Sequence, residues 1–274
     1  MAYKRILTVQ DISCVGQCSM TVALPILSAC GHETCILPTA VLSTHTGGFG
    51  KPARIHLGDI VKPFCCHWQE NDISFDAILV GYIGDSQGVQ MVSTLARKLL
   101  SPDGLLIVDP AFADNGKIYS GLDEEYASQM HKLCRQADII LPNITEAAMF
   151  AGMEYQEKPD ENYVKQLLEK LGHPNVILTG VGYGAEETGA VVYQDRSVFH
   201  YAHPKVERSF HGTGDMFASC FTGVLLQERT IPEAAQTAAD FVFSCIENTV
   251  QNPAHWYGVK FETALPELIR MINK

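Results

Sequence analysis

The 274-residue sequence contains no run of about 20 consecutive apolar residues, the length that a helix needs to cross a bilayer. Basic residues are also scarce, since 20 Lys and Arg stand against 31 Asp and Glu and give a formal charge of −11. Nucleic acids and anionic membranes bind Lys and Arg, so this balance argues against both partners. The first residues hold only the short apolar run Ile6–Val9, far below a signal-peptide core. We therefore expect a soluble, cytoplasmic protein.

Other patterns are missing as well. None of the nine cysteines forms a C-x-x-C pair, and the count is odd, so we predict reduced, mostly buried thiols in place of a zinc site or disulfide framework. The P-loop pattern is absent, and only Gly16 occupies the turn after the first predicted strand, which argues against a nicotinamide enzyme. No linker or repeat divides the sequence, so we predict a single domain over residues 1–274.

What the sequence does contain is enough apolar surface for a large core, with 46% hydrophobic and 19% charged residues. Short apolar runs alternate with longer periodic segments, which is typical of a parallel sheet covered by helices on both faces. Predicted strands are Ile6–Val9, Thr34–Leu37, Ala77–Val80, Leu105–Val108, Ile139–Leu141 and Val176–Leu178. Predicted helices cover about 17–30, 56–70, 87–100, 122–136, 160–171, 215–227, 233–247 and 261–273. The segments Gly189–Tyr193 and Val198–Ala202 flank a polar turn and predict an antiparallel hairpin at one edge.

Polar, glycine and proline residues follow most of the predicted strands. They are Gln10–Asp11, Gly81–Tyr82, Asp109–Pro110, Pro142–Asn143 and Thr179–Gly180. In a parallel α/β sheet the ligand binds at the carboxyl ends of the strands. The sequence therefore predicts a binding site at this edge of the sheet.

The strongest motif is FHGTGD at residues 210–215, which leads directly into the apolar stretch MFASCFTGVLL. The two glycines allow a tight turn whose amides, together with a helix start, can hold an anion without a basic side chain. Asp215 beside such an anion hole suits phosphoryl transfer, in which a base takes a hydroxyl proton. The alternative is that Asp215 merely caps the helix.

Two acidic segments follow neighbouring strands. Asp109 and Asp114 lie five residues apart and could help to hold Mg²⁺, which prefers oxygen ligands, or could simply form a turn. Asn143 and Glu146 match a capping box, although Glu146 could also bind a metal-bound water.

Taken together, GTGD opening a late helix, DPxxxD after a middle strand and PNxxE after the next are similar to the motifs of the ribokinase-like small-molecule kinases. STHTG at residues 43–47 and VGY at 80–82 resemble the pyridoxal (vitamin B6) kinase branch, and the resemblance covers nearly the whole chain. It implies an α/β fold of three layers (α/β/α) with a central, mostly parallel sheet. It also implies a kinase that uses ATP with Mg²⁺ to phosphorylate the 5′-hydroxymethyl group of B6 vitamers. A K⁺ ion and a homodimer are usual in this family.

The resemblance also implies roles for individual residues. Asp215 would be the base, and Gly212, Thr213 and Gly214 would form the anion hole. The remaining implied sites are Asp109, Asn143, Glu146, Thr179 and Tyr119 for ATP and its phosphates, Asp109, Asp114 and Glu146 for the metal, and Asp11, Ser13, His45, Thr46 and Tyr82 for the substrate.

The sequence departs from the branch at two positions. Asp11 stands where a serine usually follows Gln10, with Ser13 two residues later, and Leu141 stands where a threonine is common. These departures concern the substrate and leave the hydroxymethylpyrimidine kinases of thiamine synthesis as an alternative, although many of those carry Cys in place of Asp215. A non-catalytic metabolite-binding protein of the same fold is a further alternative. Sugar and nucleoside kinases usually have an N-terminal Gly-Gly pair and lid strands, which the early segment lacks.

Overall fold

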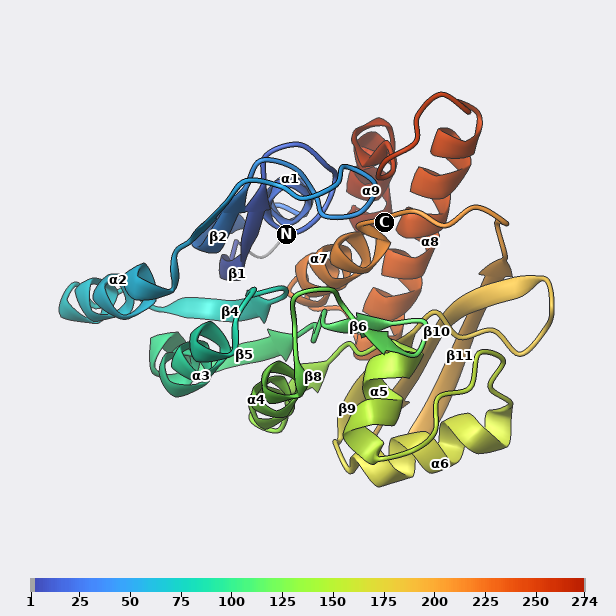
Figure 1. Ribbon diagram of the computed structural model, residues 1–274, viewed down its shortest axis with the longest axis horizontal. Coiled ribbons are helices and arrows are strands. Elements are labelled where there is room, and N and C mark those ends of the chain that lie inside the picture. The colour runs from blue at the N-terminus through green and yellow to red at the C-terminus, as the bar shows by residue number, and fades with distance from the viewer. Residues whose placement is uncertain (1–2, 274) are drawn as a thin grey trace.

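The structure is a computed structural model that describes residues 3–273. Its central sheet has nine strands within that range, in the order β11-β10-β9-β8-β5-β4-β1-β2-β3 (Figure 1). The strands are β1 (Arg5–Ser13), β2 (Glu33–Leu42), β3 (Arg54–His56), β4 (Phe75–Val80), β5 (Leu100–Val108), β8 (Ile139–Ile140), β9 (Asn175–Thr179), β10 (Glu187–Gln194) and β11 (Ser197–Pro204). The six strands from β9 to β2 run parallel, and the β10–β11 hairpin is antiparallel, as predicted.

Helices cover both faces of this sheet and make three layers (Figure 1). One face packs against α1 (Met20–Ala29), α7 (Thr213–Leu225), α8 (Ile231–Val250) and α9 (Leu265–Ile272). The other packs against α2 (Gly58–Glu70), α3 (Ser86–Leu95), α4 (Glu124–Cys134), α5 (Ile144–Ala151) and α6 (Glu161–Leu171). The predicted three-layer α/β/α fold with an antiparallel hairpin at one edge is confirmed.

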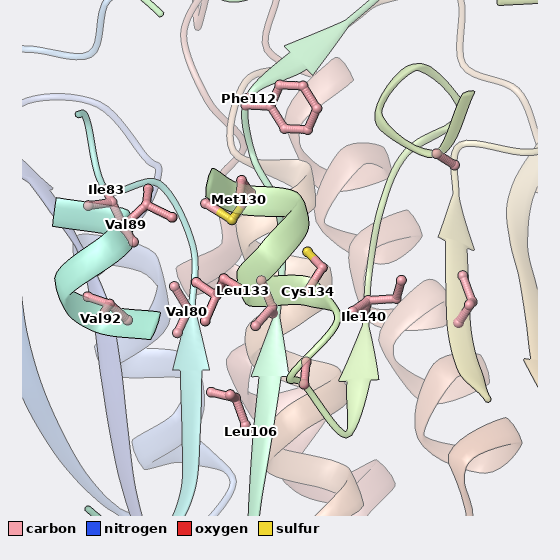
Figure 2. Close-up of a cluster of buried hydrophobic side chains, with 14 of the residues drawn as sticks. Val80, Ile83, Val89, Val92, Leu106, Phe112, Met130, Leu133, Cys134 and Ile140 are labelled. Carbon is pink, nitrogen blue, oxygen red and sulfur yellow. The ribbon is translucent and has the colours of Figure 1, made fainter. Parts of the chain in front are cut away.

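The two-sided cover explains why the strands are continuously apolar. Figure 2 shows strand residues Val80, Leu106 and Ile140 packed against side chains of α3 and α4. Their chain neighbours Leu79 and Ile107 point to the opposite face and join the second buried cluster. Successive strand residues alternate between faces, so each face needs its own apolar set and no polar alternation remains.

Aspartates fix the starts of three helices on one face of the sheet. Asp85, Asp123 and Asp160 precede α3, α4 and α6, and each side chain accepts a hydrogen bond from a backbone N–H three residues later. Such a cap satisfies one of the N–H groups that a helix start leaves unpaired. These caps explain why the predicted helices 122–136 and 160–171 begin within about two residues of the observed ones.

Several elements differ from the prediction. The helix predicted over 87–100 ends at Leu95, continues as the 3₁₀ turn η1 (Ala96–Leu99) and gives way to β5 at Leu100. The first half of β5 contains Pro102 and Gly104, residues that are uncommon in strands, so the sequence did not predict a strand there. Four elements were not predicted: the exposed edge strand β3, helix α5, and the strands β6 (Ala113–Asp114) and β7 (Lys117–Ile118), which form a small hairpin. Each is short, so it carries little periodic signal.

The structure also bears on the cysteines and on the length of the apolar helices. Six of the nine cysteines (Cys18, Cys30, Cys65, Cys134, Cys220 and Cys245) are buried, and all nine are free thiols, which confirms the mostly buried set. Within residues 3–273 no helix has the length and apolar character required to traverse a bilayer.

Backbone hydrogen bonds continue past the ends of the parallel strands and fix the loops that follow. The N–H of Asp11 donates to the carbonyl of Tyr82 (3.1 Å), that of Asp109 to Val80 (2.8 Å), and that of Thr179 to Pro142 (3.0 Å). The predicted polar residues therefore do meet at one edge of the sheet, at the carboxyl ends of β1, β4, β5, β8 and β9.

Candidate active site

The start of α7 is a glycine turn without a capping side chain. Gly212 occupies the N-cap position with φ +81° and offers no capping side chain. A β-carbon at Gly212 would lie 1.9 Å from the carbonyl oxygen of Gln17, so only glycine fits the turn. The amides that follow, in Thr213 and Gly214, belong to the first helical turn and lack partners within the helix. Together with the positive helix end they can hold an anion, as the motif predicts.

Asp215 lies in the same first turn of α7. Burial raises the pKa of its carboxyl to about 7, and the charge of Asp11 adds to this, whereas a hydrogen bond from the backbone of Ser19 lowers it. A carboxyl that titrates near neutrality can accept a proton from a hydroxyl group at physiological pH. A carboxyl with a near-neutral pKa therefore lies in the first turn of a helix whose start has no capping side chain.

Asp109 lies beside this turn, since a β-carbon at Gly214 would be 3.9 Å from its Oδ2. Its pKa is raised well above the ordinary value by burial and by the charges of Glu146 and Asp215. None of the ion pairs within residues 3–273 includes these three carboxylates. The charges of its two neighbours therefore disfavour the ionised form of Asp109.

Glu146 performs the structural task that the capping-box alternative predicted. It is 1% exposed, and its Oε2 accepts a hydrogen bond from the N–H of Asn143 (3.0 Å) while the N–H of Glu146 donates to Asn143 Oδ1 (3.0 Å). Oε1 accepts from the N–H of Phe112 (2.8 Å), which ties the loop after β5 to the start of α5. Burial raises the pKa of Glu146 to about 7, against these amide hydrogen bonds.

Asp114 and Tyr119 flank the acidic cluster. Asp114 is exposed and accepts hydrogen bonds from Asn115 through both carboxylate oxygens, at 2.8 and 3.0 Å. Burial raises the pKa of the Tyr119 phenol, as do the charges of all four site acids, so the ring lies close to the cluster. Over residues 3–273, no three His, Cys, Asp or Glu side chains gather in a way that could hold a metal by themselves. The three acids predicted as metal ligands thus form no preassembled protein-only site.

The remaining predicted nucleotide residues lie next to one another. Asn143 and Thr179 form a parallel β-bridge at the ends of β8 and β9. The Asn143 side chain donates a hydrogen bond to the carbonyl of Ala113 (2.7 Å), and Thr179 is half-buried at the rim. The loop after β5, the start of α5 and the end of β9 are therefore joined around one edge of the site.

The residues predicted to bind the substrate include a buried acid, Asp11. Asp11 is 3% exposed and accepts a hydrogen bond from the Ser13 hydroxyl (2.9 Å). Burial raises the pKa of Asp11, and the positive charge of Arg54 lowers it. Arg54 also donates a hydrogen bond to the Tyr82 phenol (3.3 Å). The charge of Asp11 in turn raises the pKa of Asp215, so the substrate side is electrostatically coupled to that carboxyl.

The STHTG loop reaches the same place from β2. The Gly47 N–H donates to Nδ1 of His45 (3.0 Å), and the His45 ring lies 4.7 Å from that of His211, directly before the anion hole. Burial and the neighbouring His211 lower the pKa of His45, which keeps its ring neutral. Thr46 is exposed at the tip of this loop.

Three residues of the site were missed from the sequence. Arg54 lies on the unpredicted strand β3, and no local pattern connected it to Tyr82. Ser19 precedes α1 at φ 49°, a conformation that serine rarely adopts, and makes no capping hydrogen bond. His211 was part of the FHGTGD motif, so its position next to the anion hole could have been read from the sequence.

Comparisons with known proteins identify the family. A family model described as phosphomethylpyrimidine kinase matches residues 27–259. The chain belongs to this family. Its members are kinases, and structures similar to the chain include pyridoxal kinases of the ribokinase-like superfamily, as the sequence motifs indicated.

Some proteins that are similar to the chain are named as pyridoxal kinases, and others as hydroxymethylpyrimidine or phosphomethylpyrimidine kinases. The structure of pyridoxal kinase from Lactobacillus plantarum is similar at 30% identity, covering 98% of this chain and 97% of that one, with a TM-score of 0.90. A candidate phosphomethylpyrimidine kinase from Bacteroides thetaiotaomicron, whose structure is described as a form with pyridoxal, is similar at 32% identity (97% and 95% covered, TM-score 0.91). A hydroxymethylpyrimidine/phosphomethylpyrimidine kinase of Bacillus subtilis is 30% identical over 65% of this chain and 66% of its own length.

Proposed function

We propose that the protein transfers the γ-phosphate of ATP to the 5′-hydroxymethyl group of pyridoxal, pyridoxine or pyridoxamine. The observation that carries the proposal is Asp215, a carboxyl with a pKa of about 7 in the first turn of α7, whose start has no capping side chain. The similarity to the Lactobacillus plantarum pyridoxal kinase supports a vitamer as substrate, since it extends over 98% of the chain.

In this mechanism Asp215 takes the proton of the substrate hydroxyl as its oxygen attacks the γ-phosphorus. The bond between the γ-phosphorus and the bridging oxygen of ADP breaks in the same displacement. Negative charge on the transferring group is held by the amides around Gly212, Thr213 and Gly214, together with the positive helix end. Asn143, Thr179 and Tyr119 would contact the nucleotide.

The acidic cluster fits a magnesium ion that arrives with ATP. Asp109 lies near Glu146 and Asp215, and no ion pair among residues 3–273 includes it, so a cation at this position would relieve the repulsion between the carboxylates. Mg²⁺ commonly uses one or two carboxylates together with phosphate oxygens and water, so it needs no preassembled protein cage. Bound there, it would neutralise phosphate charge. Asp109, Asp114 and Glu146 would be the residues that hold it.

Asp11, Ser13, His45, Thr46 and Tyr82 would surround the aromatic ring of the substrate. The buried Asp11 carboxylate shapes this side of the site electrostatically, and Tyr82 is held by Arg54. K⁺ binding, a homodimer and a cytoplasmic location stay predictions from the family resemblance and the sequence.

A second candidate function is phosphorylation of hydroxymethylpyrimidine or its phosphate. The family model and the Bacillus subtilis relative favour it. It would use the same base and anion hole on a pyrimidine in place of a pyridine ring.

One assay separates these possibilities. We expect the protein with ATP and Mg²⁺ to phosphorylate at least one of pyridoxal, pyridoxine and pyridoxamine with a higher kcat/KM than hydroxymethylpyrimidine, measured by ADP release and by product mass. A large preference for the pyrimidine would assign the second function. Absence of ATP consumption with all four compounds would support a non-catalytic metabolite-binding protein.

The activity should depend on pH through Asp215. Because its pKa is raised to about 7, the carboxyl binds a proton below that pH and loses its function as a base. We expect kcat/KM to fall by about tenfold per pH unit below roughly pH 6.5 and to level off above about 7.5 on this limb. Measuring kcat/KM from pH 5 to 9 with two different vitamers distinguishes ionisation of the enzyme, which is the same for both, from ionisation of the substrate. A profile that stays flat down to pH 5 would show a carboxyl with an ordinary pKa.

A further inference from the structure

The loop between β1 and α1 (residues 14–19) contacts the anion hole, although the proposed mechanism gives it no chemical task. The carbonyl oxygen of Gln17 lies against Gly212 so closely that a β-carbon there would be only 1.9 Å away. The N–H of His45 donates to the carbonyl of Val15 (2.8 Å), so the same loop also supports the STHTG segment. Any displacement of this loop would move the turn that presents the anion-binding amides.

The Gln17 side chain ties this loop to the far end of the sequence. Its Nε2 donates to both carboxylate oxygens of Glu262, each at 3.0 Å. Its Oε1 lies 3.3 Å from Nε2 of His255, which must carry the proton because an amide oxygen only accepts. A β-carbon at Gly258 would lie 2.6 Å from the Gln17 Cβ, so the two segments are in close contact.

The segment that receives Gln17, residues 252–263, is anchored in the core at its C-terminal end. Val259 is fully buried and Phe261 is 3% exposed, both within the core cluster beneath α7 and α8. The guanidinium of Arg208 donates to the carbonyl of His255, which fastens the strand-to-helix connection on the other side of the anion hole. Two hydrogen-bonded connections, from Gln17 and from Arg208, therefore join the loops on either side of Gly212 to this segment.

We propose that Gln17 is a positioning residue, which fixes the anion hole by holding the β1–α1 loop against Gly212 through Glu262 and His255. The inference rests on the proposed kinase function for its kinetic consequence. The anion hole would stabilise the phosphoryl group more strongly in the transition state than in bound ATP. A displaced anion hole therefore lowers kcat more than it weakens substrate binding.

The first test is Gln17→Ala, with Gln69→Ala on the exposed end of α2 as the matched control. We expect Gln17→Ala to lower kcat by roughly 10- to 100-fold, the cost of a displacement on the order of 1 Å at a reacting centre, with KM for ATP and vitamer changed less than about threefold. Gln69→Ala should keep the wild-type kcat. A kcat for Gln17→Ala equal to that of the control would overturn the proposal.

A charge exchange distinguishes positioning from a general loss of folding. Gln17→Glu places a carboxylate against Glu262 and should lower kcat. Adding Glu262→Gln reverses donor and acceptor, keeps an acceptor for His255 and should restore kcat to within about threefold of wild type. Adding Glu247→Gln, which removes an equal charge from an exposed site on α8, should not restore it. Rescue by both variants, or by neither, would contradict the specific pairing.

A readout that needs no substrate keeps this inference separate from the proposed function. Amide hydrogen exchange of Met216, whose N–H donates to the carbonyl of Gly212 (3.0 Å), should become faster in Gln17→Ala and stay at the wild-type rate in Gln69→Ala. If the wild-type protein phosphorylates none of the four compounds, the proposed function fails while faster exchange still supports the positioning role. Unchanged exchange in Gln17→Ala would overturn that role whatever the activity.

Discussion

Replacement of Asp215 by alanine is expected to lower kcat by roughly 10²- to 10⁴-fold, the usual contribution of a positioned general base. The change removes the carboxyl with a pKa of about 7 and leaves the Thr213 and Gly214 amides of the helix start in place. ATP should therefore still bind with nearly its wild-type affinity. Rapid-quench measurement of phosphoryl transfer, together with calorimetric titration of ATP, tests both parts of this expectation.

Two further variants make the result specific. Asp215→Asn keeps the shape of the side chain but cannot accept a proton, so it should lose as much activity as Asp215→Ala. Asp103→Ala removes an exposed aspartate from β5 and should leave kcat unchanged. Near-wild-type turnover in Asp215→Ala would show that another group takes the hydroxyl proton.

The second large effect is expected at Gly212. Gly212→Ala would place a β-carbon 1.9 Å from a backbone oxygen of Gln17, at φ +81°, where alanine is already strained. The backbone must shift, so we expect a loss of about 2 kcal/mol or more in unfolding free energy. Because the anion hole moves with it, kcat of the folded fraction should fall by roughly 10²-fold. Urea unfolding and steady-state kinetics measure the two effects.

The chain offers a control for each part of this substitution. Gly50 has nearly the same φ, +79°, with no atom within 4 Å of an added β-carbon, so Gly50→Ala isolates the conformational strain. Gly214 has an ordinary φ, and its added β-carbon would meet only Asp109 Oδ2 at 3.9 Å. Gly50→Ala should destabilise by about 1 kcal/mol and Gly214→Ala by less. Equal losses in all three variants would contradict the clash with Gln17.

Much of this site could be predicted from the sequence because its signals are local. The FHGTGD motif predicted a turn and helix start where α7 begins at Thr213, and the spacing of Asn143 and Glu146 predicted the capping box that is present. Apolar runs predicted strands, and parallel strands bring their carboxyl ends to one edge. For that reason Asp109 and Asp215, more than one hundred residues apart, could be expected at the same place.

Other features were beyond sequence reasoning for a physical reason. Strand β3 has three exposed residues and no apolar period, so nothing local indicated that Arg54 reaches Tyr82. Glu146 could equally have faced a metal, and its burial with three amide hydrogen bonds follows from the way the loop after β5 folds over α5. Burial also decided the near-neutral pKa of Asp215, which depends on surrounding atoms that the motif does not contain.

The sequence by itself determined the chemical content of this protein: the glycines of the turn before α7, the acids at strand ends, and strands apolar on both faces. These depend on residue type and short spacing, which act over a few neighbouring residues. Only the tertiary structure decided which groups meet across the chain, including Gln17 with Glu262, 245 residues away, and the burial of Asp11 beneath the site. Such contacts follow from how helices and loops pack on a twisted sheet, because the free energy of burial depends on all the surrounding atoms together.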